Sequence, residues 1–274
     1  MPKATLHDGA TIAIEAHGTG PTLLLPVNPV PAEGAQAEAM RAWGADPALG
    51  RSLMEGLGDL VRVAAFDYEG HVLAHPKPAT LTPDNIAADL LAVADAVGAD
   101  RFAYYGYSWL ALSGLQLALR TDRLDGLVMG GYPPVDGPYA EMLAVTRATV
   151  ELVGTATGKE ATPGDWSTVE VDLSDDQARQ FVTLYEALRG FDDLAAQGRV
   201  TCPRLCFAGS ADVIAYDARW GGTRVDVAGP IVRRRAELEA LGWTVRVLDG
   251  LDHAQAMQPA SVLPVLRPWL QAHV

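Results

Sequence analysis

Short apolar runs alternate with helical stretches along most of this chain, and that alternation constrains the fold more than any other feature. Most of the runs stop at Pro, Gly or Asp, as expected for strands that end in turns. The expected strands are residues 11–16, 22–25, 61–66, 102–105, 127–129, 204–208 and 244–248. Such strands separated by helices predict an α/β fold, with a mostly parallel central sheet covered by helices on both faces. The first two strands lie close enough in sequence to pair as a hairpin.

One stretch departs from the alternation. The expected helices are residues 51–60, 83–97, 109–119, 139–153, 174–188, 230–241 and 254–271. Two of these, 139–153 and 174–188, follow each other with no strand between them. We therefore expect residues 133–199 to form an inserted helical lid over one end of the sheet, and residues 1–132 and 200–274 to form the core. Open α/β sheets bind their ligands at the carboxyl end.

Composition and charge narrow the set of partners. The chain has 274 residues and a formal net charge of −13. Nucleic acid and anionic membrane surfaces are therefore poor partners, because phosphate binding needs a basic face. No apolar run reaches the roughly 18 residues of a spanning helix, and the first residues lack the apolar core of a signal peptide. We expect a cytoplasmic protein with a small-molecule substrate, and leave open whether it forms a homo-oligomer.

The strongest local signal is the segment 104–110, YYGYSWL. An apolar strand runs into Ser108 and then directly into a helix. A turn this tight exposes the hydroxyl above the sheet edge, at a helix N-terminus whose free N–H groups favour negative charge. The segment resembles the nucleophile elbow of the α/β-hydrolase family, G-x-S-x-G, except that Leu110 replaces the second glycine. Leu110 implies a slightly displaced helix or a gap elsewhere.

A serine nucleophile needs a base, and the base needs an anion to orient it. His253 follows the last expected strand and resembles the histidine loop of the family. Asp212 follows strand 204–208 after a glycine turn and resembles the family's acid. The order Ser108, Asp212, His253 is the family order. Asp136 is the rival acid, because some family members place the acid after the earlier strand.

The tetrahedral intermediate needs N–H donors for its oxyanion. The resemblance assigns one donor to the backbone of Trp109, directly after the nucleophile. The second should come from the loop after strand 22–25, where Asn28-Pro29 resembles the end of the H-G-x-P motif of dehalogenases and epoxide hydrolases. Pro26-Val27 stands where many family members have His-Gly. Because proline has no N–H, the donor is Val27 or Asn28, and we expect Asn28.

These residues predict a serine hydrolase that cleaves an ester, thioester or lactone of a small, mostly apolar molecule through an acyl-enzyme. Tyr107, Tyr139 and Trp166 are the expected substrate contacts. Ser108 argues against dehalogenase and epoxide hydrolase chemistry, which uses Asp at the elbow. No metal or organic cofactor is implied. Two alternatives remain: a non-catalytic ligand-binding protein on the same fold, and a cofactor-free perhydrolase or lyase that uses the same triad.

Overall fold

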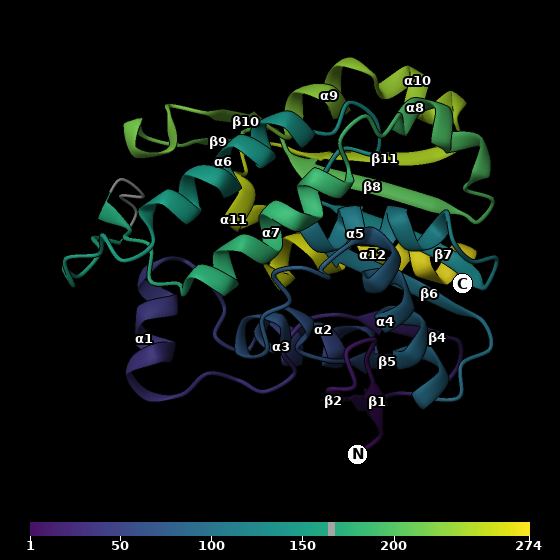
Figure 1. Cartoon of the computed structure of the whole chain (residues 1–274). Coiled ribbons are helices and arrows are strands. Elements are labelled where there is room, and N and C mark those ends of the chain that lie inside the picture. The colour runs from purple at the N-terminus through teal and green to yellow at the C-terminus, as the bar shows by residue number, and fades with distance from the viewer. Residues whose placement is uncertain (164–167) are drawn as a thin grey trace.

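The structure is a computed structural model that describes residues 1–163 and 168–274. A 7-stranded sheet runs through the molecule in the order β11-β8-β7-β6-β4-β5-β3 (Figure 1). Its strands are β3 (Glu15–His17), β4 (Thr22–Leu25), β5 (Arg62–Ala65), β6 (Phe102–Tyr107), β7 (Leu124–Gly130), β8 (Arg204–Gly209) and β11 (Trp243–Leu248). The edge strand β3 is antiparallel to β5, and the other pairings in this sheet are parallel. The predicted mostly parallel sheet is confirmed.

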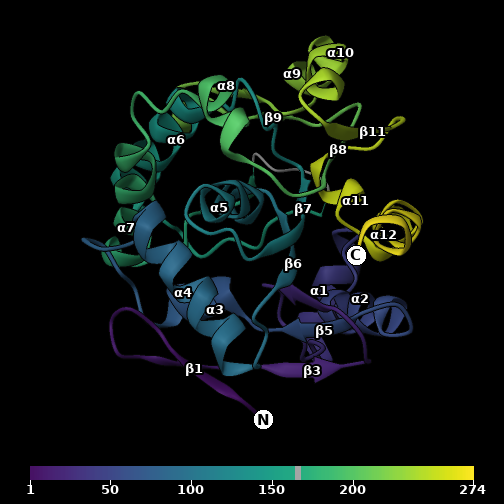
Figure 2. The same ribbon diagram turned by 90° about the vertical axis from the view of Figure 1, so that its right-hand side faces the viewer.

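Helices cover both faces of this sheet (Figure 2). On one face lie α4 (Pro83–Ala96) and α5 (Trp109–Ala118), and on the other α2 (Leu49–Leu57) and α12 (Pro259–His273). Successive residues of β4 pack on opposite faces of the sheet: Leu24 lies in the apolar core on one face, and Leu23 and Leu25 lie in the apolar core on the other. Burial on both faces is why the strand reads as a continuous apolar run. No helix of the described ranges is long and apolar enough to cross a membrane.

The chain between β7 and β8 is helical. It holds α6 (Tyr139–Leu152), α7 (Asp175–Ala187), α8 (Asp193–Ala196) and the 3-10 turn η2 (Gln197–Arg199). Helix α7 begins with a capping box. The backbone N–H of Gln177 donates to Oγ of Ser174, and the backbone N–H of Ser174 donates to Oε1 of Gln177. The helices α6 and α7 lie side by side in both views (Figures 1 and 2). That this segment acts as a lid, with the domain limits given above, remains a prediction.

A second excursion leaves the sheet after β8. The strands β9 (Val213–Ala215) and β10 (Arg224–Asp226) form a hairpin that carries the 3-10 turn η3 (Ala218–Trp220) and lies beside α6 (Figure 1). The indole Nε1 of Trp220 donates to Oγ1 of Thr149 on α6, at 2.9 Å. At the base of the hairpin, the backbone N–H groups of Val227 and Ala228 both donate to the carbonyl of Asp212. The hairpin therefore leaves and rejoins the core at one residue.

The N-terminal strands differ from the prediction. Residues 11–16 divide into β2 (Thr11–Ala13), which pairs with β1 (Lys3–Thr5), and β3, which pairs with β5. The expected hairpin between the first two strands is therefore wrong. The hairpin does not form because β4 already pairs with β5 on one side and β6 on the other, and has no free edge for a third strand. Residues 68–74, where neither a helix nor a strand was expected, form the helix α3 (Tyr68–Ala74).

The C-terminal third is more finely divided than expected. The predicted helix 230–241 is two helices, α9 (Ala228–Arg233) and α10 (Arg235–Ala240), and the predicted helix 254–271 is α11 (His253–Ala256) followed by α12. One further helix, α1 (Gly34–Ala42), lies where the sequence indicated no element. The break between α11 and α12 coincides with Pro259, whose missing N–H suits a helix start.

Candidate active site

Ser108 occupies the junction between β6 and α5 with φ 57° and ψ −131°. A positive φ is uncommon for a residue with a Cβ, and persists where the surrounding structure enforces it. The backbone N–H of Ser108 donates to the carbonyl of Gly130 at 2.8 Å, which ties the turn to β7. The hydroxyl does not cap α5, and the residue is partly exposed. The side chain is therefore free to face solvent at the sheet edge.

The two glycine positions of the motif behave differently. A Cβ on Gly106 would lie 2.3 Å from the carbonyl oxygen of Leu110, so only glycine fits this close approach of strand and helix. Leu110 stands at the second position. It is buried in the core, its carbonyl accepts a hydrogen bond from the Tyr104 hydroxyl at 2.8 Å, and α5 still begins at Trp109. The elbow thus forms with leucine at this position.

Asp212 and His253 are hydrogen-bonded to each other. The Nδ1 atom of His253 lies 2.9 Å and 3.0 Å from the two carboxylate oxygens of Asp212. Asp212 is fully buried, whereas the His253 side chain is 24% exposed. A buried carboxylate at Nδ1 selects the tautomer whose Nε2 is free to accept a proton, and stabilises the imidazolium form. The pair therefore has the geometry of a general base and its orienting acid.

Backbone contacts hold the loops of Asp212 and His253 together. The N–H of Ser210 donates to the carbonyl of Leu248 at 2.8 Å, and the N–H of Ala211 donates to the carbonyl of Leu251 at 3.0 Å. A Cβ on Gly209 would lie 2.0 Å from the same Leu251 oxygen. The closeness of the two loops therefore depends on a glycine at the end of β8.

Tyr107 links the serine turn to the histidine loop. Its hydroxyl donates to the backbone carbonyl of His253 at 2.8 Å, and the two rings lie 5.0 Å apart. Gly130 and Gly131 leave room for the phenol ring, since a Cβ on either would lie within about 2.6 Å of it. Burial raises the pKa of the Tyr107 hydroxyl, so it stays a neutral donor. These contacts position His253, and the expected contact of Tyr107 with substrate remains a prediction.

Asp136, the rival acid, and Asp252, the neighbour of His253, are both hydrogen-bonded to other groups. Asp136 also has a positive φ of 57°, but its Oδ2 accepts a 2.5 Å hydrogen bond from Nε of Arg234. Asp252 caps α11 by accepting from the N–H of Gln255 at 2.8 Å. Among the described residues, Asp212 is thus the carboxylate that the structure pairs with His253.

The loop after β4 leaves the same carboxyl edge of the sheet as the loop after β6, since the two strands are parallel neighbours, and it carries one free amide. The N–H of Val27 donates to the carbonyl of Leu25 at 2.8 Å, and Oδ1 of Asn28 accepts from the N–H of Val30 at 2.9 Å. Within the described ranges, neither the Asn28 N–H nor the Trp109 N–H has a protein acceptor. Free amides at these two positions are what an oxyanion requires. Their assignment to that role remains a prediction.

The indole of Trp109 lies between two aromatic rings from other elements. The ring of Phe181 on α7 packs edge-on against it at 5.4 Å, and the ring of Tyr68 on α3 lies 6.1 Å away. Sequence reasoning missed Tyr68, because residues 68–74 read as loop. The overlooked signal was Asp67, whose side chain caps α3 by accepting from the N–H of Gly70 at 2.9 Å.

The remaining predicted substrate contacts are Tyr139 and Trp166. Tyr139 packs against Tyr132, the last residue before the inserted segment, at 6.1 Å, and against Phe191 within that segment at 5.8 Å. Trp166 lies outside the described residues. Neither prediction is tested by these contacts.

Ser108, Asp212 and His253 follow β6, β8 and β11, at the carboxyl ends of parallel strands. Among described residues the structure gives no hydrogen bond between the Ser108 hydroxyl and His253. Catalytic hydrogen bonds are often long in enzymes without substrate and tighten in the complex. Elsewhere in the described ranges, no group of three His, Cys, Asp or Glu side chains is placed to hold a metal ion.

Comparison with solved structures shows the fold of this chain. No family model matches it, and no curated protein sequence matches it. A thermophilic esterase from Thermogutta terrifontis has 19% identity and a TM-score of 0.65, covering 99% of this chain and 98% of its own. An enol-lactonase from Burkholderia xenovorans LB400 has 17% identity and a TM-score of 0.58, covering 98% and 99%. An epoxide hydrolase of the alpha/beta hydrolases superfamily, from hot-environment metagenomes, has 17% identity and a TM-score of 0.59, covering 99% and 98%. The predicted fold is confirmed by these likenesses.

Proposed function

We propose that this chain, which has the α/β-hydrolase fold, is a serine hydrolase acting on an ester, thioester or lactone of a small, mostly apolar molecule. The observation that carries the proposal is the elbow geometry of Ser108, whose neighbour Tyr107 contacts the ring and the backbone of His253. His253 is in turn bound to the buried Asp212. The esterase and the enol-lactonase among similar structures support the substrate class.

In the proposed mechanism, the Ser108 hydroxyl attacks the substrate carbonyl while Nε2 of His253 takes its proton. Asp212 accepts the hydrogen bond from Nδ1–H and stabilises the imidazolium. The amides of Asn28 and Trp109 donate to the oxyanion, and removing one such donor typically costs roughly 10²–10³ in turnover. His253 then protonates the leaving group, and a water activated by the same ring releases the acyl group.

We further propose that α7 acts as part of a lid. The support is the edge-on contact between Phe181 on α7 and Trp109, the residue directly after the nucleophile. The partly buried rings of Phe181 and Trp109 offer apolar surface next to the nucleophile, which suits an apolar acyl or leaving group. Tyr68 is fully buried and contacts Trp109 from within the core. A closed lid also excludes water from the reacting atoms.

The test is covalent labelling with a fluorophosphonate, together with turnover of short p-nitrophenyl esters. The wild-type protein should be labelled once and should turn over esters, and Ser108→Ala should lose both. Ser261→Ala removes a hydroxyl whose one hydrogen bond in the described part of the chain goes to the Gln255 carbonyl, and should behave as wild type. Full turnover by Ser108→Ala would refute the proposal. An unlabelled wild-type protein that small ligands stabilise strongly would favour the binding-protein alternative.

A further inference from the structure

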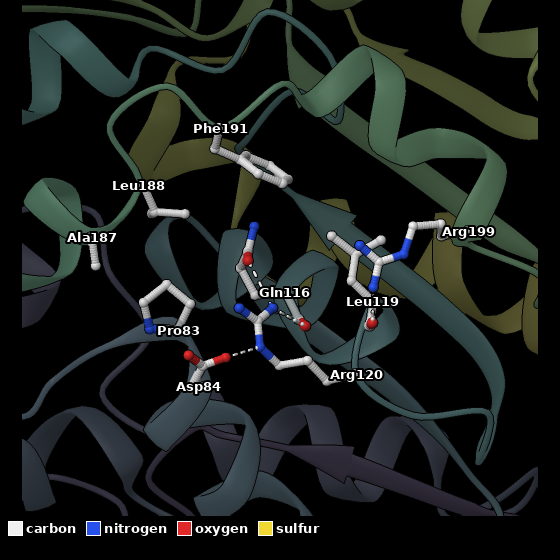
Figure 3. A pocket seen from close by; sticks show the side chains of 9 residues that line it. All are labelled: Pro83, Asp84, Gln116, Leu119, Arg120, Ala187, Leu188, Phe191 and Arg199. Atoms are coloured by element: carbon white, nitrogen blue, oxygen red, sulfur yellow. Dashed lines mark hydrogen bonds and ion pairs between the residues drawn. The ribbon is translucent and has the colours of Figure 1, made fainter.

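A separate cavity lies at the end of α5 that is remote from Ser108. It has a volume of about 340 Å³ and lies between the start of α4, the end of α5 and the chain that follows α7 (Figure 3). An α-helix rises about 1.5 Å per residue, so Gln116, which lines the cavity from α5, lies roughly 12 Å along the helix from Ser108. The volume is at the lower end of the range for small-molecule sites. The cavity is thus distinct from the proposed active site.

A buried donor without a partner lies in the wall of this cavity. Gln116 is 2% exposed, and its amide nitrogen has no hydrogen-bond partner within the described ranges. The amide oxygen is already used, because it accepts from Nη1 of Arg120 at 2.9 Å. In Figure 3 the amide nitrogen faces the side of the cavity where Phe191 lies. A buried N–H without an acceptor is unfavourable, so an acceptor entering between Phe191 and Arg120 would be stabilised there.

The cavity is locally positive although the chain is strongly acidic. Nε of Arg120 donates to Asp84 at 2.6 Å, whereas Arg199 has no carboxylate partner in the part of the chain that the structure describes. The two arginines also bind the last carbonyls of α5: Arg199 donates through Nη2 to Leu119 at 2.7 Å, and Arg120 through Nη1 to Gln116. Within residues 1–163 and 168–274, Nη2 of Arg120 and both Nε and Nη1 of Arg199 have no protein acceptor. The cavity therefore has two arginines and one carboxylate, and the excess positive charge would be neutralised by a ligand with a single anionic group.

The rest of the wall is apolar. Phe191 lies above the Gln116 amide, and Leu188 and Pro83 lie to one side of it (Figure 3). We propose that this cavity binds a small monocarboxylate with an aromatic or branched apolar body. The carboxylate would accept from Arg199, Arg120 and the Gln116 amide, as arginine forks favour carboxylates, and the body would lie against Phe191. The proposal does not depend on the hydrolase assignment.

The experiment measures benzoate binding to the full chain by calorimetry and by ligand-observed NMR. Benzamide, which is neutral and nearly the same shape, should bind at least about tenfold more weakly, since charge-assisted hydrogen bonds are about twice as strong as neutral ones. The decisive variant is Gln116→Glu. It keeps the acceptor for Arg120 and puts a carboxylate where the ligand's own would lie, so benzoate affinity should fall by tenfold or more.

Two further variants test whether a loss of binding reflects a damaged fold, and whether benzoate binds in the active site instead. Asp84→Asn removes the competing carboxylate and should tighten benzoate binding severalfold, which no damaged fold would do. His253→Ala should leave this binding unchanged, because benzoate in the active site would use that imidazole. The proposal is overturned if the wild-type protein shows no saturable benzoate binding up to about 50 mM, well above the millimolar Kd of a weak specific ligand. Equal affinity for benzamide, or binding lost in His253→Ala and kept in Gln116→Glu, would also overturn it.

Discussion

Replacing Gly209 by alanine tests whether the spacing of two loops sets the rate. The added Cβ would lie 2.0 Å from the carbonyl oxygen of Leu251, where ordinary contact begins at 3.4 Å. The contacting atom is backbone, so the loop that carries His253 must retreat by about 1.4 Å from the segment that carries Asp212. A misplacement of about 1 Å in catalytic groups can cost roughly 10²-fold. We expect kcat to fall by about that factor, and unfolding stability by about 1–3 kcal/mol.

The assay is kcat on a p-nitrophenyl ester, with the rate of fluorophosphonate labelling as a second readout and circular dichroism to show that the variant folds. Gly198→Ala is the matched control, because a Cβ there meets nothing within 4 Å and its φ is not positive. The control should keep wild-type kcat. A folded Gly209→Ala protein with the kcat of the control would refute the reasoning that this close approach aligns Asp212 with His253.

The other predictions concern single side chains. Tyr107→Phe removes the hydrogen bond to the His253 carbonyl and should cost about 1 kcal/mol in thermal or urea unfolding, with a severalfold loss of kcat; unchanged values for both would contradict its positioning role. Asp212→Asn should lower kcat by roughly 10³–10⁴, whereas Asp136→Asn should keep it within about twofold, and the reverse ranking in steady-state assays would move the acid to Asp136. Burial lowers the pKa of His71 below 6.5, so the unfolded chain binds more protons and stability should fall as pH drops through and below 6.5. His71→Gln should flatten that dependence in urea titrations across this range, and an unchanged slope would exclude His71 as its source.

The sheet and the elbow were predictable from sequence because their signals are local. Strands buried on both faces, such as β4, carry unbroken apolar runs, and their limits were expected closely. The elbow lies within one contiguous segment, so a strand, a serine and a helix could be seen together. Asp212 and His253 were accessible through the resemblance and the chain order, although their pairing spans 41 positions.

The features that sequence missed depend on partners distant in the chain. The strands β9 and β10 are each 3 residues long and are stabilised by pairing with each other and by the bond from Trp220 to α6. Residues 11–16 divide into two strands that pair with β1 and β5, because both edges of β4 are already occupied by β5 and β6. The contact from the Tyr107 hydroxyl to His253 joins residues 146 positions apart, and no pattern in the sequence indicates it.

The hairpin that starts after Asp212 and returns to the same residue's carbonyl has a consequence for how this chain tolerates change. Val225 is buried in the core and Trp220 is bonded to α6, so the base and flank of the hairpin are part of the packed structure. The exposed tip, at positions 218, 219, 221 and 222, is therefore the place where sequence can be inserted with least effect on the acid, because both ends of the excursion are tied to the carbonyl of Asp212.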